Sequence, residues 1–516
     1  MMRKLFILAI LALVTTPAFA QSVDTVWVRR YNGPANGIDY AYAIAVDGSG
    51  NVCVTGYSYG GDLISDDYAT IKYYPNGDTA WVRRYNGPGN GQDVAYAIAV
   101  DGVGNIYVTG KSVGNEADYD YATIKYRPNG DIAPGWPKRY DEPSGNFSDE
   151  AYAIAVDGSG NVYVTGYSIS STTAGDYATI KYDSLGNELW VRRYNGPQNW
   201  YDIAQSIVVD GSGYIYVTGG SFGGVGERDY ATIKYYPNGD TVWVRRYNGT
   251  GNLYDIAYAI AVDGSGNVYV TGFSYGGAPH DDYATVSYTP NGDVRWVRRY
   301  NGPGNFIDDA FAIVLDGSYN VYVTGYSADQ GGDFDYATVS YDQNGSERCV
   351  RRYDGTGGWY DHAKAITIDD SNSVYVTGGS IGNQTDWDYA TIKYDSSCNE
   401  RWVKRYNGPG NSTDSASAIA VDDSHYVYIT GGSIGNGTNF DYVTIKYVQF
   451  LCGDANKDGV VDIGDVVYLI NYLFINGPSP VPILHAGDAN CDEVVDVSDV
   501  VYLINYLFIN GPQPCC

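Results

Sequence analysis

The chain has 516 residues, of which 44% are apolar, 15% aromatic and 18% charged. A chain this long and this rich in aromatic residues is not disordered, and it exceeds one small domain, so several cores or a repeat array are expected. Its 65 Gly and 54 Tyr residues are typical of strands joined by tight turns. The formal net charge of −28 argues against a nucleic-acid partner, because phosphate binding needs a basic surface.

The first 20 residues have the pattern of a secretion signal. Arg3 and Lys4 precede the apolar stretch 5–14, and small residues stand at 18–20 before Gln21. A membrane anchor is the alternative, but this stretch is shorter than the roughly 20 residues that span a bilayer, and no later segment is apolar enough. We therefore expect a secreted, extracellular bacterial protein without a membrane span, whose mature chain has 30 basic and 60 acidic residues.

Residues 21–447 contain eight repeats of about 53 residues. The string WVRRY or a close variant recurs at spacings of 53 to 55 residues, beginning at Trp27, Trp81, Trp136, Trp190, Trp243, Trp296, Cys349 and Trp402. Each unit carries four runs rich in Val, Ile, Thr and Tyr, separated by Gly/Asn/Asp turns. In the fifth unit these runs are 257–263, 268–272, 282–288 and 294–300. Such runs and turns are strand and turn signals.

Four strands in a repeat of this length are typical of one blade of a β-propeller, in which neighbouring blades bury each other's faces. The chain starts with a fourth-type run at 26–31 and ends its repeats with a third-type run at 441–447. The first strand is therefore expected to complete the last blade. The sequence predicts an all-β, eight-bladed β-propeller closed by the N-terminal strand, and the alternative is a seven-bladed ring with one displaced unit.

The units resemble the bacterial β-propeller repeat family (SBBP-type repeats). The family's hallmark, AIAVDxxGNVYVTG, stands here at 153–166 and again at 259–272. The resemblance covers nearly all of residues 24–447. It implies a fold rather than one activity, because propellers host many functions, and relatives of this kind look like secreted or surface binding modules.

One face of the predicted ring is uniform and the other varies. Turns after the first and third runs are nearly identical between units, whereas the loops on the opposite face differ. Aromatic residues stand at equivalent places in these varied loops, namely Phe147, Trp200, Tyr201, Tyr254, Phe306, Trp359 and Tyr360. Exposed planar side chains on a rigid scaffold suit a glycan or an extended peptide. Packing between the blades is the other interpretation, and neither is preferred.

Carboxylates on this face are candidates for catalytic or cation-binding groups. Two Asp residues recur in every unit, for example Asp93 and Asp120 in the second, and capping of turns explains an eightfold repetition better than a cation-attracting mouth. Side chains that are not repeated are the better candidates for catalysis, and these are Glu116, Glu142, Glu150, Glu227, His280 and Asp281. Nothing in their spacing organises them into a catalytic constellation, so no catalytic residue is predicted.

The strongest chemical motif is an oxygen-rich loop that occurs at 454–465 and again at 488–499. Asp or Asn stands at loop positions 1, 3, 5, 9 and 12, and position 7 offers its carbonyl, which is the EF-hand spacing for Ca²⁺. The predicted ligands are Asp454, Asn456, Asp458, Val460, Asp462 and Asp465, and in the second loop Asp488, Asn490, Asp492, Val494, Asp496 and Asp499. Position 6 is Gly459 in the first loop, which permits the sharp turn, but Glu493 in the second, which leaves that geometry open.

Each loop runs into the same helical segment, VVYLINYLFIN, at 466–476 and 500–510, and Gly-Pro ends both segments. After a linker at 448–451, residues 452–516 resemble a type I dockerin, a duplicated calcium-loop and helix module. The alternative, an acidic surface hairpin, does not explain the ligand spacing twice.

The dockerin resemblance implies a metal and a partner. It implies two Ca²⁺ ions, folding that depends on them, and a cohesin domain of another protein that contacts the first helix and the loop ends. Loop positions 10 and 11 often help to choose the cohesin. Here they are Ile463-Gly464 and Val497-Ser498, instead of the Ser-Thr pair of the best-known group.

Seven Cys residues are expected in an oxidising compartment, and the odd number leaves at least one thiol without an intrachain partner. Cys53, Cys349 and Cys398 are scattered over the repeats. The remaining four lie near the C-terminus, where Cys452 is a candidate to pair with Cys515 or Cys516 if the ends of the duplicated module lie close together. The sequence predicts no other pairing.

Three functions are compatible with this organisation. The favoured one is a secreted, non-catalytic binding or scaffold propeller that its dockerin attaches to a cohesin-bearing partner. A dockerin-bearing extracellular enzyme of polysaccharide degradation, such as a glycoside hydrolase, is the first alternative, and a structural envelope protein is the second. Whether the chain is an enzyme stays open, because the sequence names no catalytic group.

Overall fold

The computed structural model describes residues 21–60, 65–143, 147–223, 227–276, 280–509 and 511–514. The predicted secretion signal, residues 1–20, lies outside this part of the chain. Two compact units are present, one formed by Thr25–Tyr447 and the other by the residues from Val448 onward with those that precede Thr25. Within the described ranges, no helix combines the length and the apolar character needed to cross a membrane.

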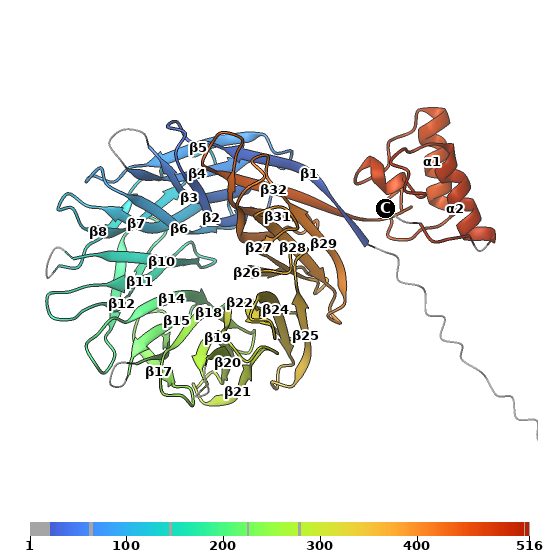
Figure 1. Cartoon of the computed structure of the whole chain (residues 1–516). Coiled ribbons are helices and arrows are strands. Elements are labelled where there is room, and N and C mark those ends of the chain that lie inside the picture. The colour runs from blue at the N-terminus through green and yellow to red at the C-terminus, as the bar shows by residue number, and fades with distance from the viewer. Residues whose placement is uncertain are drawn as a thin grey trace, which may run out of the picture. The chain divides into compact units, whose positions relative to one another are not determined.

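The first unit is an eight-bladed β-propeller, in which each blade is an antiparallel four-stranded sheet (Figure 1). The strands of the first four blades are β2 (Asp39–Val46), β3 (Val52–Tyr59), β4 (Asp66–Tyr73), β5 (Thr79–Tyr85); β6 (Asp93–Val100), β7 (Ile106–Val113), β8 (Tyr119–Tyr126), β9 (Lys138–Tyr140); β10 (Asp149–Val156), β11 (Val162–Ser168), β12 (Asp176–Tyr182), β13 (Glu188–Tyr194); β14 (Ile203–Val209), β15 (Ile215–Phe222), β16 (Arg228–Tyr235) and β17 (Thr241–Tyr247).

The last four blades repeat the same order, with the innermost strand first. Their strands are β18 (Asp255–Val262), β19 (Val268–Tyr275), β20 (Asp281–Tyr288), β21 (Val294–Tyr300); β22 (Asp308–Leu315), β23 (Val321–Ala328), β24 (Phe334–Tyr341), β25 (Glu347–Tyr353); β26 (Asp361–Ile368), β27 (Val374–Ile381), β28 (Trp387–Tyr394), β29 (Glu400–Tyr406); β30 (Asp414–Val421), β31 (Val427–Ile434), β32 (Phe440–Leu451) and β1 (Gln21–Tyr31).

The N-terminal strand closes the ring. In the eighth blade the strand order is β1-β32-β31-β30. The last repeat supplies the three inner strands of this sheet, and β1 is its outermost strand. The innermost strands of the first and eighth blades, β2 and β30, also contact each other. The prediction of eight blades closed by the first strand is therefore confirmed, and the seven-bladed alternative is wrong.

The hydrophobic cores lie between neighbouring blades. In one of them, Tyr230 and Trp243 of the fourth blade pack against Val268 and Val270 of the fifth. The hydroxyl of Tyr230 also donates a hydrogen bond to the main-chain oxygen of Ala284 in the fifth blade, at 3.0 Å. Because a single blade cannot bury its own faces, this sharing of a core stabilises the ring as a whole.

The WVRRY string is the connector between blades. In the fourth blade the indole N–H of Trp243 and the guanidinium of Arg245 donate to main-chain oxygens of the fifth blade, and the contact of Arg245 with Gly292 is 2.6 Å. The second arginine, Arg246, forms an ion pair with Asp229 of its own blade at 2.8 Å. The motif therefore recurs because each blade needs the same contact with the next one.

The second unit contains two helices, α1 (Ile463–Ile475) and α2 (Val497–Ile509), with a short 3-10 helix η1 (Leu484–Gly487) between them (Figure 1). Leu469 of α1 and Leu503 of α2 belong to its buried core. Residues 448–451, predicted as a linker, are instead the end of β32, because Val448 and Phe450 continue the apolar alternation of the strand and are buried. Phe450 packs against Ala486 of η1.

Candidate functional site

The first oxygen-rich loop is folded around its own carboxylates. The Asp454 side chain accepts hydrogen bonds from the main-chain N–H groups of Asp458 and Gly459, at 3.1 and 3.0 Å. Asp465 accepts from the N–H groups of Asn456 and Asp462, at 3.2 and 2.9 Å. The carboxylates at positions 1 and 12 therefore hold both ends of the loop together, as the predicted ligand spacing requires.

Positions 9 and 12 also cap the helix that follows each loop. In α1 the N-cap is Asp462, whose side chain accepts from the N–H of Gly464 at 2.6 Å, while Asp465 reaches back to the N–H of Asp462. This reciprocal arrangement is a capping box. One carboxylate thus links the loop to α1, so a loss of the loop's order would also uncap the helix.

The second loop reproduces the first despite its departure at position 6. Glu493 adopts a positive φ of 68°, close to the 86° of Gly459. Its N–H donates to Asp488 at 2.9 Å, which matches the contact of Gly459 with Asp454. The open question about this loop is therefore answered, since Glu493 takes the left-handed conformation that glycine takes more readily.

The donor set of each loop fits a hard divalent cation. Asp465 and Asp499 are fully buried, and Asp454 and Asp488 are nearly so. Burial, with a smaller contribution from the neighbouring carboxylates Asp454 and Asp458, raises the pKa of Asp465 to about 6 against the opposing effect of its main-chain hydrogen bonds. Carboxylates that crowd together in this way need a compensating positive charge. Ca²⁺ supplies two charges and prefers oxygen ligands, so these residues would hold it and it would neutralise them.

Both helices expose apolar side chains. Ile463, Val467 and Phe474 are exposed along α1, and Val497, Val501 and Phe508 are exposed at the equivalent places on α2. Solvent-exposed apolar residues at a spacing of about one helical turn form a stripe, which is typical of a helix that meets another protein.

The geometry agrees with comparisons to protein families. Residues 452–508 match the model of the type I dockerin domain, and residues 26–64, 80–116, 145–171 and 242–277 match the model of the SBBP β-propeller repeat. Residues 452–508 are a type I dockerin domain. The resemblance seen in the sequence is confirmed for both parts of the chain, and dockerin domains in general bind calcium and cohesin domains.

Comparison with curated proteins finds no match. Among solved structures, the chain is similar to the α-L-arabinofuranosidase Arb93A from Fusarium graminearum, with 10% identity, 57% of this chain and 91% of that chain covered, and a TM-score of 0.37. It is also similar to an ulvan lyase of polysaccharide lyase family PL25, with 12% identity, 66% of this chain and 90% of that chain covered, and a TM-score of 0.40. A third similar structure is Drosophila plexin A in complex with semaphorin 1b, with 9% identity, 86% of this chain and 89% of that chain covered, and a TM-score of 0.39. At these TM-scores the similarities carry no argument about function.

The dockerin positions that often choose the cohesin lie at the start of the helices. Ile463 and Val497, at loop position 10, are about half exposed, at 51% and 54%. Gly464 and Ser498 follow them, and the hydroxyl of Ser498 donates to Asp496 at 2.6 Å. The apolar residue at position 10 therefore begins the exposed stripe of each helix.

The loop aromatics of the propeller are at the surface. Trp200 and Trp359 are each 59% exposed, and Phe147, Tyr201, Tyr254, Phe306 and Tyr360 are exposed as well. Several of these aromatic residues follow a residue in the left-handed conformation, such as Asn199 before Trp200 and Asn305 before Phe306. They are not buried between the blades, although Phe306 packs against His280 and Tyr360 against Phe334 of the preceding blade.

The two recurring Asp positions are part of the scaffold. In the second blade, Asp93 accepts from the N–H groups of Gly87 and Val113, at 2.7 and 3.0 Å, and so caps the loop before its strand. Asp120 forms an ion pair with Arg139, and the equivalent pair is present in every blade. Capping explains the first set, as expected. Arginine pairing, which the sequence interpretation missed, explains the second.

The side chains considered for catalysis fall into separate places. Glu116 and Glu142 both lie close enough to Asp141 to add to the rise in its pKa that burial causes. His280 lies close enough to Asp281 to oppose the rise that burial causes in the pKa of that carboxyl. Glu150 forms an ion pair with Lys111 at 3.3 Å and accepts hydrogen bonds from Tyr152 and Tyr167. His280 packs against Phe306, with 4.9 Å between the ring centroids. These contacts are with neighbours in the scaffold or the loops, so they assign no catalytic role.

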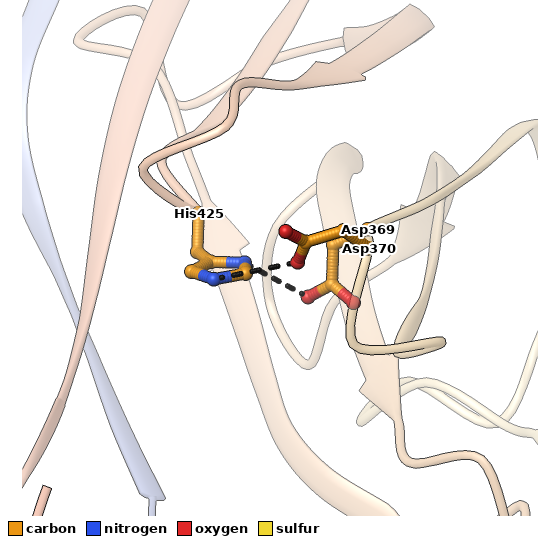
Figure 2. A group of neighbouring side chains, drawn as sticks. All are labelled: Asp369, Asp370 and His425. Atoms are coloured by element: carbon orange, nitrogen blue, oxygen red, sulfur yellow. Dashed lines mark ion pairs between the residues drawn. The ribbon is translucent and has the colours of Figure 1, made fainter.

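A histidine links two turns on the uniform face. Figure 2 shows the imidazole of His425 facing the carboxylates of Asp369 and Asp370, and its ring nitrogens lie 3.4 and 3.6 Å from their oxygens. These side chains come from the turns β26–β27 and β30–β31 of neighbouring blades. Asp369 also accepts from the Tyr375 hydroxyl and the Ser373 N–H, at 2.7 and 2.8 Å. The group is therefore a polar contact between neighbouring blades.

The cysteines of the propeller include a disulfide that the sequence did not predict. Cys349 of β25 is bonded to Cys398, in the turn before β29 of the next blade, whereas Cys53 is a buried free thiol. In the dockerin, Cys452 and Cys491 are both disulfide-bonded. Cys515 and Cys516, the partners expected for Cys452, lie outside the described residues.

Proposed function

We propose that the chain is an extracellular, non-catalytic binding protein whose dockerin attaches it to a cohesin domain of another protein in a calcium-dependent manner. The observation that carries this proposal is the duplication in the dockerin. Each of two carboxylate loops runs directly into a helix with an exposed apolar stripe. Export would follow from the predicted signal at residues 1–20.

We assign one Ca²⁺ to each dockerin loop. The first would be held by Asp454, Asn456, Asp458, Asp462, Asp465 and the carbonyl of Val460, and the second by Asp488, Asn490, Asp492, Asp496, Asp499 and the carbonyl of Val494. The ion would neutralise each carboxylate cluster and fix the first turn of the adjoining helix, so the apolar stripe is presented only when the ion is bound.

Surface plasmon resonance of the full chain against a panel of type I cohesin domains tests the attachment. Binding is expected in the presence of Ca²⁺ and is expected to be lost with EDTA. The double variant Val467→Asp/Val501→Asp charges both stripes and should abolish binding, whereas Val103→Asp on the uniform propeller face is the matched control. Failure of every cohesin to bind the calcium-loaded chain would contradict the proposal.

We further propose that the loop aromatics of the propeller contact an extended extracellular ligand, a glycan or a peptide. Their exposure on the varied face supports this role, because rigid planar side chains bind such ligands at low entropic cost. Glycan and peptide arrays probed with the full chain and with Trp200→Ala/Trp359→Ala test it. Binding that the double variant retains in full would exclude these residues.

A further inference from the structure

The innermost strand of every blade carries a β-bulge at the same position. At each one the pairing with the next strand skips a single residue. A bulge re-aims the side chain of the extra residue. The bulge residues, in blade order, are Tyr42, Tyr96, Tyr152, Gln205, Tyr258, Phe311, Lys364 and Ser417.

The bulge residues of neighbouring blades meet around the propeller axis. The rings of Tyr42 and Tyr96 have centroids 5.6 Å apart, and those of Tyr258 and Phe311 are 5.4 Å apart. The Lys364 ammonium lies over the Phe311 ring, 4.9 Å from its centroid. The eight equivalent positions on the innermost strands therefore form one ring around the propeller axis, and we call it the bulge ring.

The bulge ring departs from the aromatic pattern in three blades. Five of its members are aromatic, the fourth blade supplies Gln205, and the adjacent seventh and eighth blades supply Lys364 and Ser417. The facing position on the second strand changes in the same three blades, where Gly220, Gly379 and Gly432 stand in place of the aromatic residue that Tyr326 represents in the sixth. Aromatic side chains are thus missing from two sectors, and the one formed by the adjacent seventh and eighth blades is the wider.

A hollow lies in the sector of the seventh and eighth blades. It has a volume of about 590 Å³ and is lined by Tyr42, Tyr96, Phe311, Lys364 and Ser417, among others. A second hollow of about 240 Å³ shares Lys364 with it and extends to His362 and Trp387. These volumes are in the range of small-molecule sites, which combine apolar walls with a few polar groups.

The polar groups beside the hollow retain hydrogen-bonding capacity. His362 stacks on Tyr326, with 4.6 Å between the ring centroids, and its buried Nε2 has no partner among the described residues. The Tyr326 hydroxyl donates to one oxygen of Asp309, and the other oxygen is likewise buried without a described partner. Burial lowers the pKa of His362 to about 4, so its imidazole is neutral at pH 7 and can accept or donate a hydrogen bond.

The fold does not require a polar residue at the position of His362, because other blades place Tyr40, Ile203 or Ile256 there. Burying unpaired polar atoms costs free energy. His362 lines the smaller hollow and its Nε2 has no described partner, which points to a ligand that supplies one.

We propose that the hollow at the bulge ring binds a neutral saccharide. The flat faces of Tyr42, Tyr96 and Phe311 suit the apolar face of a sugar ring, and Lys364, His362 and Ser417 suit its hydroxyl groups. The acidic chain and Asp309 disfavour an anionic ligand, while Lys364 disfavours a cationic one. This site is distinct from the loop aromatics and from the dockerin, so it can fail or succeed without them.

Isothermal titration calorimetry of the calcium-loaded full chain tests the proposal, with neutral trisaccharides of glucose, xylose, mannose, galactose and N-acetylglucosamine as probes. At least one should bind. Ser417→Tyr restores the residue that four other blades carry and should fill the hollow, and Lys364→Met removes a donor with little change in size. Each is expected to weaken binding at least tenfold, whereas Val103→Ser on the opposite face should leave it unchanged.

Several outcomes would overturn the assignment. These are an absence of heat with all five trisaccharides, binding only of charged probes such as trigalacturonic acid or choline, and affinities that neither variant alters. Circular dichroism establishes that each variant is folded, and Lys364→Met decides the matter if Ser417→Tyr does not fold. The Trp200→Ala variant, run in parallel, separates this site from the loop aromatics, because it should retain trisaccharide binding.

Discussion

The hydroxyl of Tyr283 donates a hydrogen bond of 3.0 Å to the main-chain oxygen of Ala337 in the next blade. The equivalent bond joins seven of the eight pairs of neighbouring blades within the described residues, and the exception is Tyr389, whose buried hydroxyl has no described partner. Blade eight carries Val443 where the other blades carry Ala. The seam between the seventh and eighth blades is therefore the one with the altered contact.

This difference predicts that the same substitution, Tyr to Phe, lowers the free energy of unfolding by different amounts at Tyr283 and at Tyr389. Tyr283→Phe removes one of the hydrogen bonds that the Ala337 oxygen accepts, leaving the weaker one from the Thr324 hydroxyl, and should lower the free energy of unfolding by about 0.5–1.5 kcal/mol. Tyr389→Phe removes a hydroxyl that is already unpaired and should be close to neutral. Urea unfolding followed by tryptophan fluorescence measures both, and equal losses in the two variants would refute the assignment of the bond.

The conformation at loop position 6 predicts a second contrast, this time in the dockerin. Gly459→Ala places a side chain at a φ of 86°, where the left-handed backbone costs roughly 1–2 kcal/mol, although no atom lies within 4 Å to obstruct it. Glu493→Ala exchanges one non-glycine residue for another and should change little. Calcium titration of the full chain should show weaker binding at one site for Gly459→Ala only, and weakening in both variants would contradict this account.

Removal of calcium should unfold the dockerin and spare the propeller. Without the ion, the buried carboxylates of each loop repel one another and the capping box of α1 loses its support. Hydrogen exchange with mass spectrometry on the full chain is expected to show loss of protection over α1 and α2 after EDTA treatment. Peptides from β2 to β31 serve as the internal control, and protected helices in EDTA would count against metal-dependent folding.

Reduction of the Cys349–Cys398 disulfide should destabilise the propeller. The bond closes a segment of 49 residues and ties β25 to the following blade, for which a loss of about 2–4 kcal/mol is typical. Cys349→Ser/Cys398→Ser should unfold at lower urea concentration than the parent chain. The Cys53→Ala variant is the control, since burial raises the pKa of this thiol to about 12 and keeps it unreactive.

The buried capping aspartates predict an unusual pH dependence. Burial raises the pKa of Asp93, Asp255, Asp308 and Asp361 to about 6 and that of Asp149 to about 7, above the value of about 3.9 in an unfolded chain. Between these values the folded form binds more protons, so the stability from these groups is fully present below about pH 4 and is lost progressively as the pH rises to about 6 to 7.

Denaturant midpoints of the propeller at about pH 5.0, where these groups still contribute, and at about pH 7.5, where they no longer do, measure the effect. The contribution of these aspartates should favour the folded state at the lower pH. Asp149→Asn removes one titrating group and should reduce the difference between the two midpoints. A difference that Asp149→Asn leaves unchanged would show that this residue does not titrate in the window.

Much of this architecture could be predicted because the chain repeats. The spacing of the Trp residues and the displaced run at 26–31 were sufficient for the number of blades and for the closure, and the spacing of oxygen side chains was sufficient for the dockerin loops. The pairing of Cys349 with Cys398 was missed, although both depart from the repeat. Cys349 stands where other blades have Trp, and Cys398 where they have the turn glycine that this Trp covers, as Trp296 covers Gly345.

Other features depend on three-dimensional detail that the repeat does not encode. The β-bulge at Tyr42 and its equivalents is not visible as an interruption in the sequence pattern of the strand. The sequence therefore does not predict it. The end of β32 was taken for a linker because Val448 and Phe450 lie beyond the last repeat. Their burial is decided by tertiary packing, which overrides position in the repeat.

Placing β1 in the last blade also sets an order of events during synthesis. The strand that is made first has no partner until β32 emerges, so the nascent chain must keep its leading segment unpaired while the seven complete blades take shape. Final locking of the circle is then a late step. A shortened product that stops before β32 would be left with a dangling first strand and an open seam, which a quality-control protease could recognise.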